Sequence, residues 1–86
     1  RARRPDAVEL LQQPGRALPF YERVVTLAPE VSMGWYGLAS AHLELARPGV
    51  AIGILEQGLE RTRPQGRTKT AFLELLRKAR GARDSQ

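Results

Sequence analysis

The sequence Pro14-Gly15-Arg16-Ala17 recurs as Pro48-Gly49-Val50-Ala51, 34 residues further along the chain. The residues that follow the two copies correspond at the same offset, so that Leu18 is matched by Ile52. A short turn that returns at a fixed period indicates a repeated supersecondary unit. The repeat therefore decides the architecture before any local pattern is considered.

Apolar residues around the second copy have helical spacing. Between Met33 and Leu45 they step by three and four residues, which marks one face of a helix. Ser32 is the expected N-cap of this helix. We expect a turn at Pro48-Gly49 to end it and a second helix to run from there to about Thr62. The expected core residues are Trp35, Leu38, Ala39, His42 and Leu45 in the first of these helices, and Val50, Ile54, Leu55 and Leu59 in the second.

The same pattern extends to both ends of the chain. We expect a short helix over residues 5–13, a second over 16–28 and a last one over 67–80, and no stretch alternates like a strand. The sequence therefore predicts one all-α domain of about five helices. Its expected parts are a first helix pair at approximately 1–31, a second pair at 32–65, a C-terminal capping helix at 66–81 and a tail at 82–86.

The period and the residues placed on it resemble the tetratricopeptide repeat. Trp35, Leu38 and Ala39 stand at the Trp, Leu and small-residue places of that family's motif, and Ala51 and Leu55 occupy places in its second helix. The earlier unit matches only the second half of the motif, with Ala17, Tyr21, Val24 and Pro29. The resemblance implies a right-handed α-solenoid of antiparallel helix pairs.

Charge is distributed unevenly along the 86 residues, which carry a formal net charge of +5. Residues 5–60 hold three arginines against seven acidic residues, whereas residues 61–86 hold eight basic residues against two acidic ones. Two interpretations stay open: contact with an acidic protein tail, RNA or a phosphate surface, or the solvated face of a capping helix.

Composition limits the possible cofactors and locations. The absence of cysteine excludes disulfides and thiolate metal sites, and no apolar run approaches the ~20 residues that span a membrane. We expect no cofactor, no metal and no membrane span, and we expect a cytoplasmic protein.

The sequence offers few residues from which to build an enzyme. His42 is the only histidine, and Ser40, two residues away, points to another face of the helix. Glu56 and Glu60 lie on one helix face, where solvated carboxylates are usual. No dinucleotide-binding or P-loop glycine pattern is present. We therefore expect no catalytic site.

In tetratricopeptide arrays the first helix of each pair lines a concave groove, and the resemblance implies such a groove here. The implied groove residues are Met33, Tyr36, Ser40, Leu43 and Glu44 in the middle unit, and Arg67, Thr70, Glu74, Arg77 and Lys78 in the terminal helix. Helical geometry supports the grouping, because Tyr36, Ser40 and Leu43 step by four and three. The other interpretation is that Tyr36 and Leu43 pack on the neighbouring unit.

These observations predict a protein–protein interaction scaffold that binds a peptide or a helix in its groove. The expected partner has an apolar anchor and acidic residues that face the basic end. One alternative is an RNA- or anionic-surface-binding module that uses the Arg-rich terminal helix, with nucleic acid the less favoured partner. Another is a self-associating subunit of a larger assembly, that is, a homo-oligomer.

Overall fold

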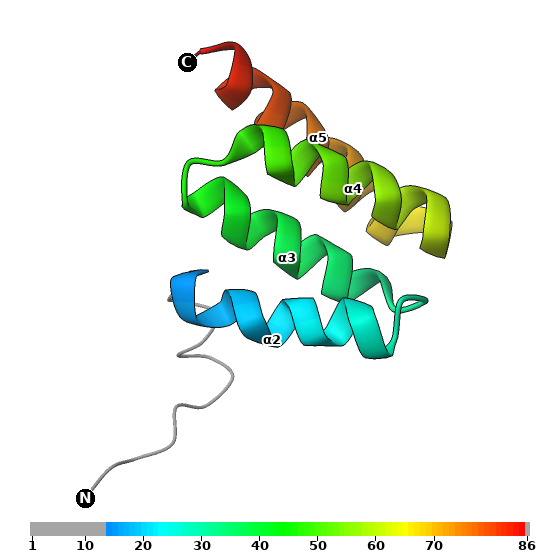
Figure 1. The fold of residues 1–86 in the computed structure, drawn as a ribbon. Coiled ribbons are helices and arrows are strands. Elements are labelled where there is room, and N and C mark those ends of the chain that lie inside the picture. Colours follow the sequence, from blue (N-terminus) through cyan, green and yellow to red (C-terminus); the bar gives the residue numbers. More distant parts are fainter. Residues whose placement is uncertain (1–13, 86) are drawn as a thin grey trace, which may run out of the picture.

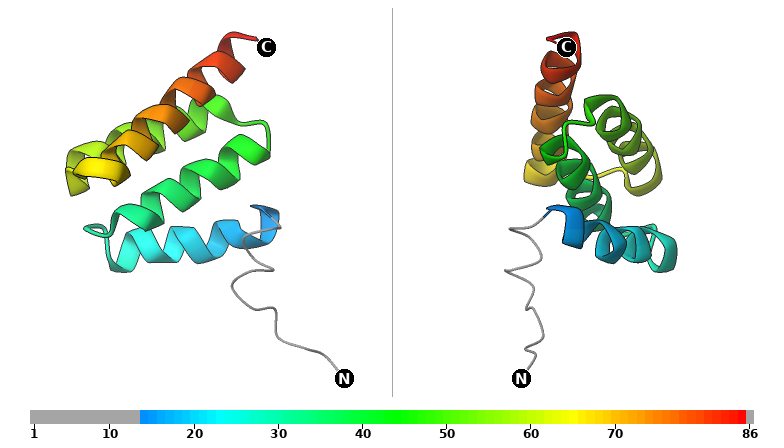
Figure 2. Two further views of the ribbon diagram at one scale, coloured as in Figure 1. Left: turned by 180° about the vertical axis from the view of Figure 1, so that it is seen from behind. Right: turned by 60° about the vertical axis from the view of Figure 1, so that its left-hand side comes forward.

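The computed structural model describes residues 14–85, which form four helices and no strand (Figure 1). They are α2 (Pro14–Leu27), α3 (Ser32–Glu44), α4 (Pro48–Thr62) and α5 (Gly66–Asp84). Each helix packs antiparallel on the next, and α3 also contacts α5, which runs in the same direction (Figure 2). The predicted all-α class is confirmed. The helix expected over residues 5–13 lies outside the described residues.

The helices begin and end differently from the sequence prediction at several points. The two Pro-Gly pairs do not form turns: each opens a helix, α2 at Pro14 and α4 at Pro48. Proline is well placed there because its missing N–H would have no intrahelical partner. The turn before α4 is instead made at Ala46, whose φ is 61°, and the Arg47 N–H donates to the His42 carbonyl.

Two further expectations about helix ends are wrong. Ser32 is the first residue of α3 rather than its N-cap, and its hydroxyl donates to Thr62 Oγ1 at 3.0 Å. The last helix continues through Asp84, so most of the expected tail is helical. Gly81 does not end α5. No proline follows it, and the helix continues through Ala82 and Arg83. The Ser85 N–H donates to the Gly81 carbonyl at 3.1 Å.

The core lies between α3, α4 and α5. Phe72 of α5 and Leu55 of α4 are both 0% exposed, and burying side chains of this size contributes about 2–3 kcal/mol each. Trp35 packs in the same cluster, and its Nε1–H donates to the Pro29 carbonyl at 2.8 Å. The cluster consists of Trp35, Ala39, Ala51, Ile52, Leu55, Phe72, Leu75, Leu76 and Ala79.

Helix α4 passes close to its neighbours because Gly58 has no side chain. A Cβ at this position would lie 2.7 Å from Trp35 Cβ and 2.9 Å from Phe72 Cε2. Four of the nine residues expected in the core are buried, namely Trp35, Leu38, Ala39 and Leu55, and four are half-buried, namely His42, Leu45, Ile54 and Leu59. Val50 is an exception: it lies in the first turn of α4 and is 48% exposed.

Candidate partner-binding groove

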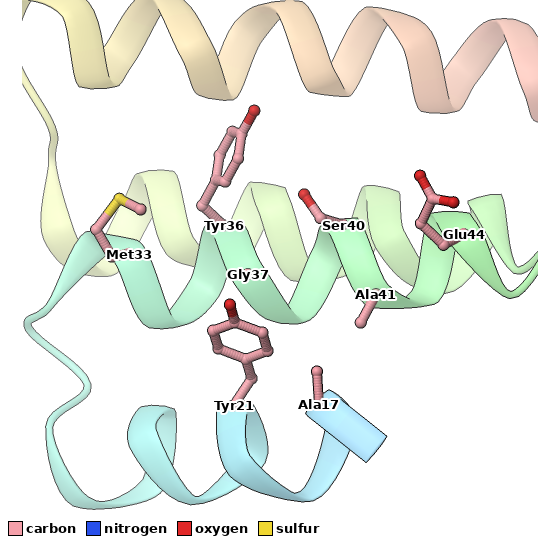
Figure 3. A pocket seen from close by; sticks show the side chains of 8 residues that line it. All are labelled: Ala17, Tyr21, Met33, Tyr36, Gly37, Ser40, Ala41 and Glu44. Atoms are coloured by element: carbon pink, nitrogen blue, oxygen red, sulfur yellow. The ribbon is translucent and has the colours of Figure 1, made fainter. Parts of the chain in front are cut away.

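The face of α3 that is turned away from the core carries a hollow of about 200 Å³ between α2 and α3. Figure 3 shows Ala17 and Tyr21 of α2 pointing toward α3, while Tyr36 of α3 points toward α5. The lining is largely apolar, and half of its residues are small. It consists of Ala17, Tyr21, Met33, Tyr36, Gly37, Ser40, Ala41 and Glu44.

Gly37 allows the Tyr21 ring to lie directly on the backbone of α3. A Cβ on Gly37 would overlap ring atoms of Tyr21, and one on Gly34 would lie 2.7 Å from Val24 Cγ1. The ring is further held by Phe20, edge-to-face at 5.3 Å between centroids. Burial raises the pKa of the Tyr21 hydroxyl, so this wall of the hollow stays uncharged at neutral pH.

A second hollow of about 260 Å³ lies between α3 and α5 and shares Met33 and Tyr36 with the first. Its floor includes Phe72, whose ring centroid lies 5.6 Å from that of Tyr36. Met33 is 64% exposed at the junction of the two hollows. We call the two hollows together the α3 groove. The second hollow is lined by Met33, Tyr36, Arg67, Thr68, Ala71 and Phe72.

The α3 groove carries opposite charges toward its two ends. Glu44 lies near the C-terminal end of α3, and Arg67 lies beside Met33 near the N-terminal end. Met33 and Glu44 are about 16 Å apart along the helix, at ~1.5 Å per residue. Arg67 forms no ion pair with another described residue, and the first turns of α3 and α5 hold no acidic residue.

The structure brings together five of the groove residues named from the sequence: Met33, Tyr36, Ser40 and Glu44 of α3, and Arg67 of α5. Leu43 is half-buried and packs against the core cluster, and it lines neither hollow. The reason lies in the helical rotation of ~100° per residue, which places Leu43 within ~40° of the buried Ala39. Tyr36 packs against the core cluster and also lines both hollows.

Of the predicted groove residues of α5, only Arg67 lines the groove. Thr70, Glu74, Arg77 and Lys78 are all exposed, and none lines either hollow. The α5 wall is formed by Arg67 together with Thr68, Ala71 and Phe72, which were not predicted as groove residues. Ala71 follows Arg67 by four residues, which is ~40° more than a full helical turn, whereas Thr70 follows it by three, which is ~60° less. Thr70 is therefore rotated away from Arg67 in the opposite direction to Ala71.

Sequence reasoning did not find the part of the groove that α2 contributes. The residues missed in the first hollow are Ala17 and Tyr21 of α2, and Gly37 and Ala41 of α3, which lie opposite them. A signal for them was present, since Gly34, Gly37 and Ala41 step by three and four on α3. Such a stripe of small residues indicates the face on which a neighbouring helix approaches closely.

The groove holds little that can perform chemistry. Ser40 and Glu44 both line the first hollow, one turn apart on α3, and the described residues contain no cluster of three or more His, Asp or Glu side chains able to hold a metal ion. His42 is half-buried, and its Nδ1 has no hydrogen-bond partner among the described residues. Burial, reinforced by Arg47, lowers the pKa of His42, while Glu22 opposes this shift.

No helix within residues 14–85 combines the length and the apolar character needed to cross a membrane. No protein-family model matches the chain, and no curated protein or solved structure matches it either. The tetratricopeptide assignment therefore stays a prediction from the sequence. The site itself is a largely apolar groove with Glu44 toward one end and Arg67 toward the other.

Proposed function

We propose that this chain is a protein-interaction module of the tetratricopeptide type, which binds a peptide or helix of a partner protein in the α3 groove. The observation that carries the proposal is the continuity of the two hollows through Met33 and Tyr36. Supporting it, α3 and α5 are in contact and parallel although α4 separates them in the chain (Figure 2). First helices of successive pairs in a right-handed solenoid would have this relation.

The residues of the groove suit a protein ligand. Tyrosine is enriched among the residues that dominate binding energy at interfaces, and methionine adapts its shape to different partners. An exposed Met33 next to Tyr36 offers both properties in one place. The two hollows are lined by no histidine, and the described residues hold no cluster of metal ligands, so we propose binding without catalysis.

An RNA- or anionic-surface-binding role is the second candidate, because α5 carries six basic residues against two acidic ones. These cations do not share one face. Arg67 lines the α3 groove, Lys69 lines a hollow on the side of α4, and Arg80 lies 3.5 Å from Glu56 of α4. Nucleic-acid binding favours a basic stripe on one face, so we prefer the protein ligand.

The proposal is tested by selecting random 12-residue peptides, displayed on phage, against the purified chain. The groove variant is Met33→Glu, and the matched control is Val50→Glu, another exposed apolar residue that lines neither hollow of the groove. We expect selected peptides to bind the wild type and Val50→Glu alike and to lose most binding to Met33→Glu. An empty selection, or peptides that bind Met33→Glu equally well, would contradict the proposal.

The same proteins distinguish the alternatives. A fluorescent mixed-sequence 12-nucleotide RNA that binds the wild type and Met33→Glu equally, with affinity that falls steeply with salt, would favour the RNA-binding role. Sedimentation at several concentrations tests self-association. A dimer that Met33→Glu dissociates would show that the groove is occupied by a second copy of the chain instead.

A further inference from the structure

Building on the proposed function, we infer that the α3 groove takes a peptide with one bulky apolar side chain and an acidic residue two or three positions away from it. The apolar side chain enters the hollow between Tyr21 and Tyr36, and the carboxylate lies toward Arg67. The inference fixes both the chemistry of the partner segment and its placement along α3.

The size of the first hollow limits it to a single side chain. At about 200 Å³ it is smaller than the ~300–1,000 Å³ of typical small-molecule pockets. Ala17, Gly37 and Ala41 keep it open, and the rings of Tyr21 and Tyr36 bound it (Figure 3). Because its wall is mainly apolar carbon, a Leu, Met or Phe side chain gains the most by entering it.

Charge gives the groove a direction. Arg67 is the cation that lines it, and no described acidic residue forms an ion pair with Arg67. Glu44, near the other end, would repel an acidic residue placed there. An acidic residue of the ligand is therefore favoured on the Met33 side of the anchor and disfavoured on the Glu44 side.

The spacing follows from helix and strand dimensions. Gly37, beneath the first hollow, lies four residues from Met33, which is beside Arg67. Four residues correspond to ~6 Å along α3, at ~1.5 Å per residue. An extended peptide covers this distance in about two residues at ~3.3 Å each. We therefore place the carboxylate two or three positions from the anchor.

The test repeats the phage selection with Arg67→Glu and with Lys69→Glu. Lys69 is a matched control, because it lies on the same helix and is also exposed but lines the hollow on the α4 side. Both variants change the net charge equally. We expect the wild type and Lys69→Glu to enrich Asp or Glu two or three positions from a bulky apolar residue, and Arg67→Glu to enrich Lys or Arg at that position.

Synthetic fluorescein-labelled versions of the selected peptides quantify the effect by anisotropy. Changing the acidic residue to Gln should weaken binding to the wild type about threefold to fivefold, as an exposed ion pair predicts, and binding to Arg67→Glu by less than about twofold. Circular dichroism verifies that each variant is folded.

The outcomes separate the two proposals. Groove-dependent peptides without an acidic residue at the expected position, or the same acidic peptides selected by Arg67→Glu, would overturn the inference and leave the proposed function intact. An empty selection on the wild type would overturn both.

Discussion

The two sides of α3 are packed in different ways. Toward α4, and toward α5 beneath the second hollow, the space is filled by large side chains, with Trp35, Leu55 and Phe72 at the centre of the core. Toward α2 the helices approach through Ala17 and glycines, and a hollow remains beside the Tyr21 ring. Among the described elements α2 packs on α3 alone. The filled side stabilises the fold, and the hollow side leaves room for another molecule.

The largest effect is expected on the filled side. Phe72→Ala removes a side chain that is 0% exposed, and the cavity should lower the free energy of unfolding by about 4 kcal/mol. Small domains are stable by about 5–15 kcal/mol in total, so urea denaturation should show a variant close to unfolding. Phe72→Leu, which keeps much of the volume, should lose less. Equal losses in the two variants would contradict the packing described.

A smaller, local effect is expected on the hollow side from Gly37→Ala. The new Cβ overlaps the Tyr21 ring and must displace it, at a cost of about 1–3 kcal/mol, partly offset by the ~1 kcal/mol helix preference of alanine. Hydrogen exchange should therefore rise in α2 and stay nearly unchanged in α4.

The same experiment has two controls. Gly53→Ala, in α4, meets no atom within 4 Å and should stabilise the protein by about 0.5–1 kcal/mol. In a Tyr21→Ala background Gly37→Ala should lose most of its cost. A cost that persists there would mean that Tyr21 is not the group displaced.

A third effect concerns His42, on α3. Because burial and Arg47 lower its pKa in the folded state, the unfolded chain, with a pKa near 6.5, takes up the proton first as pH falls. The free energy of unfolding should therefore decrease from about pH 7 down to the folded pKa, and it should be independent of His42 above that range. His42→Gln should remove this part of the slope. Stability that rises on acidification through this window would contradict the assignment.

The smallest effect is expected from the ion pair between Arg80 and Glu56 on the filled side. The atoms are 3.5 Å apart and both side chains are more than half exposed. Glu56→Gln should change stability by less than about 0.5 kcal/mol, and less still in high salt. A loss above 1 kcal/mol would mean that charge, and not apolar packing alone, holds α5 on α4.

The sequence predicted the filled side better than the hollow side. Apolar spacing of three and four places Trp35, Leu38 and Leu55 in the core correctly, because the residues on the buried face of a helix recur every three or four positions in the sequence. The hollow depends on the small size of Gly37 and Ala41 and on the position of the Tyr21 ring. A repeat pattern within one helix does not contain that information, since it depends on how closely a second helix approaches.

Helix ends show the same limit. The Pro-Gly pairs indicate a boundary between helices, but proline is equally favourable in a β-turn and at the first position of a helix. The choice was decided by Ala46, which takes the left-handed conformation that a sequence pattern would assign to glycine. Because Ala46 is not glycine, the sequence contains no residue that would have indicated the position of the turn.

Tyr36 belongs to both sides, since it contacts Phe72 and lines the groove. A ligand in the proposed groove would contact this ring, and any ligand that binds only the folded chain stabilises it by an amount that grows with the logarithm of ligand concentration above Kd. Thermal shift thus becomes a binding assay that needs no label. Substitution of Tyr36 should therefore disturb both the core and the groove, whereas Met33 is 64% exposed and its substitution should leave the fold intact.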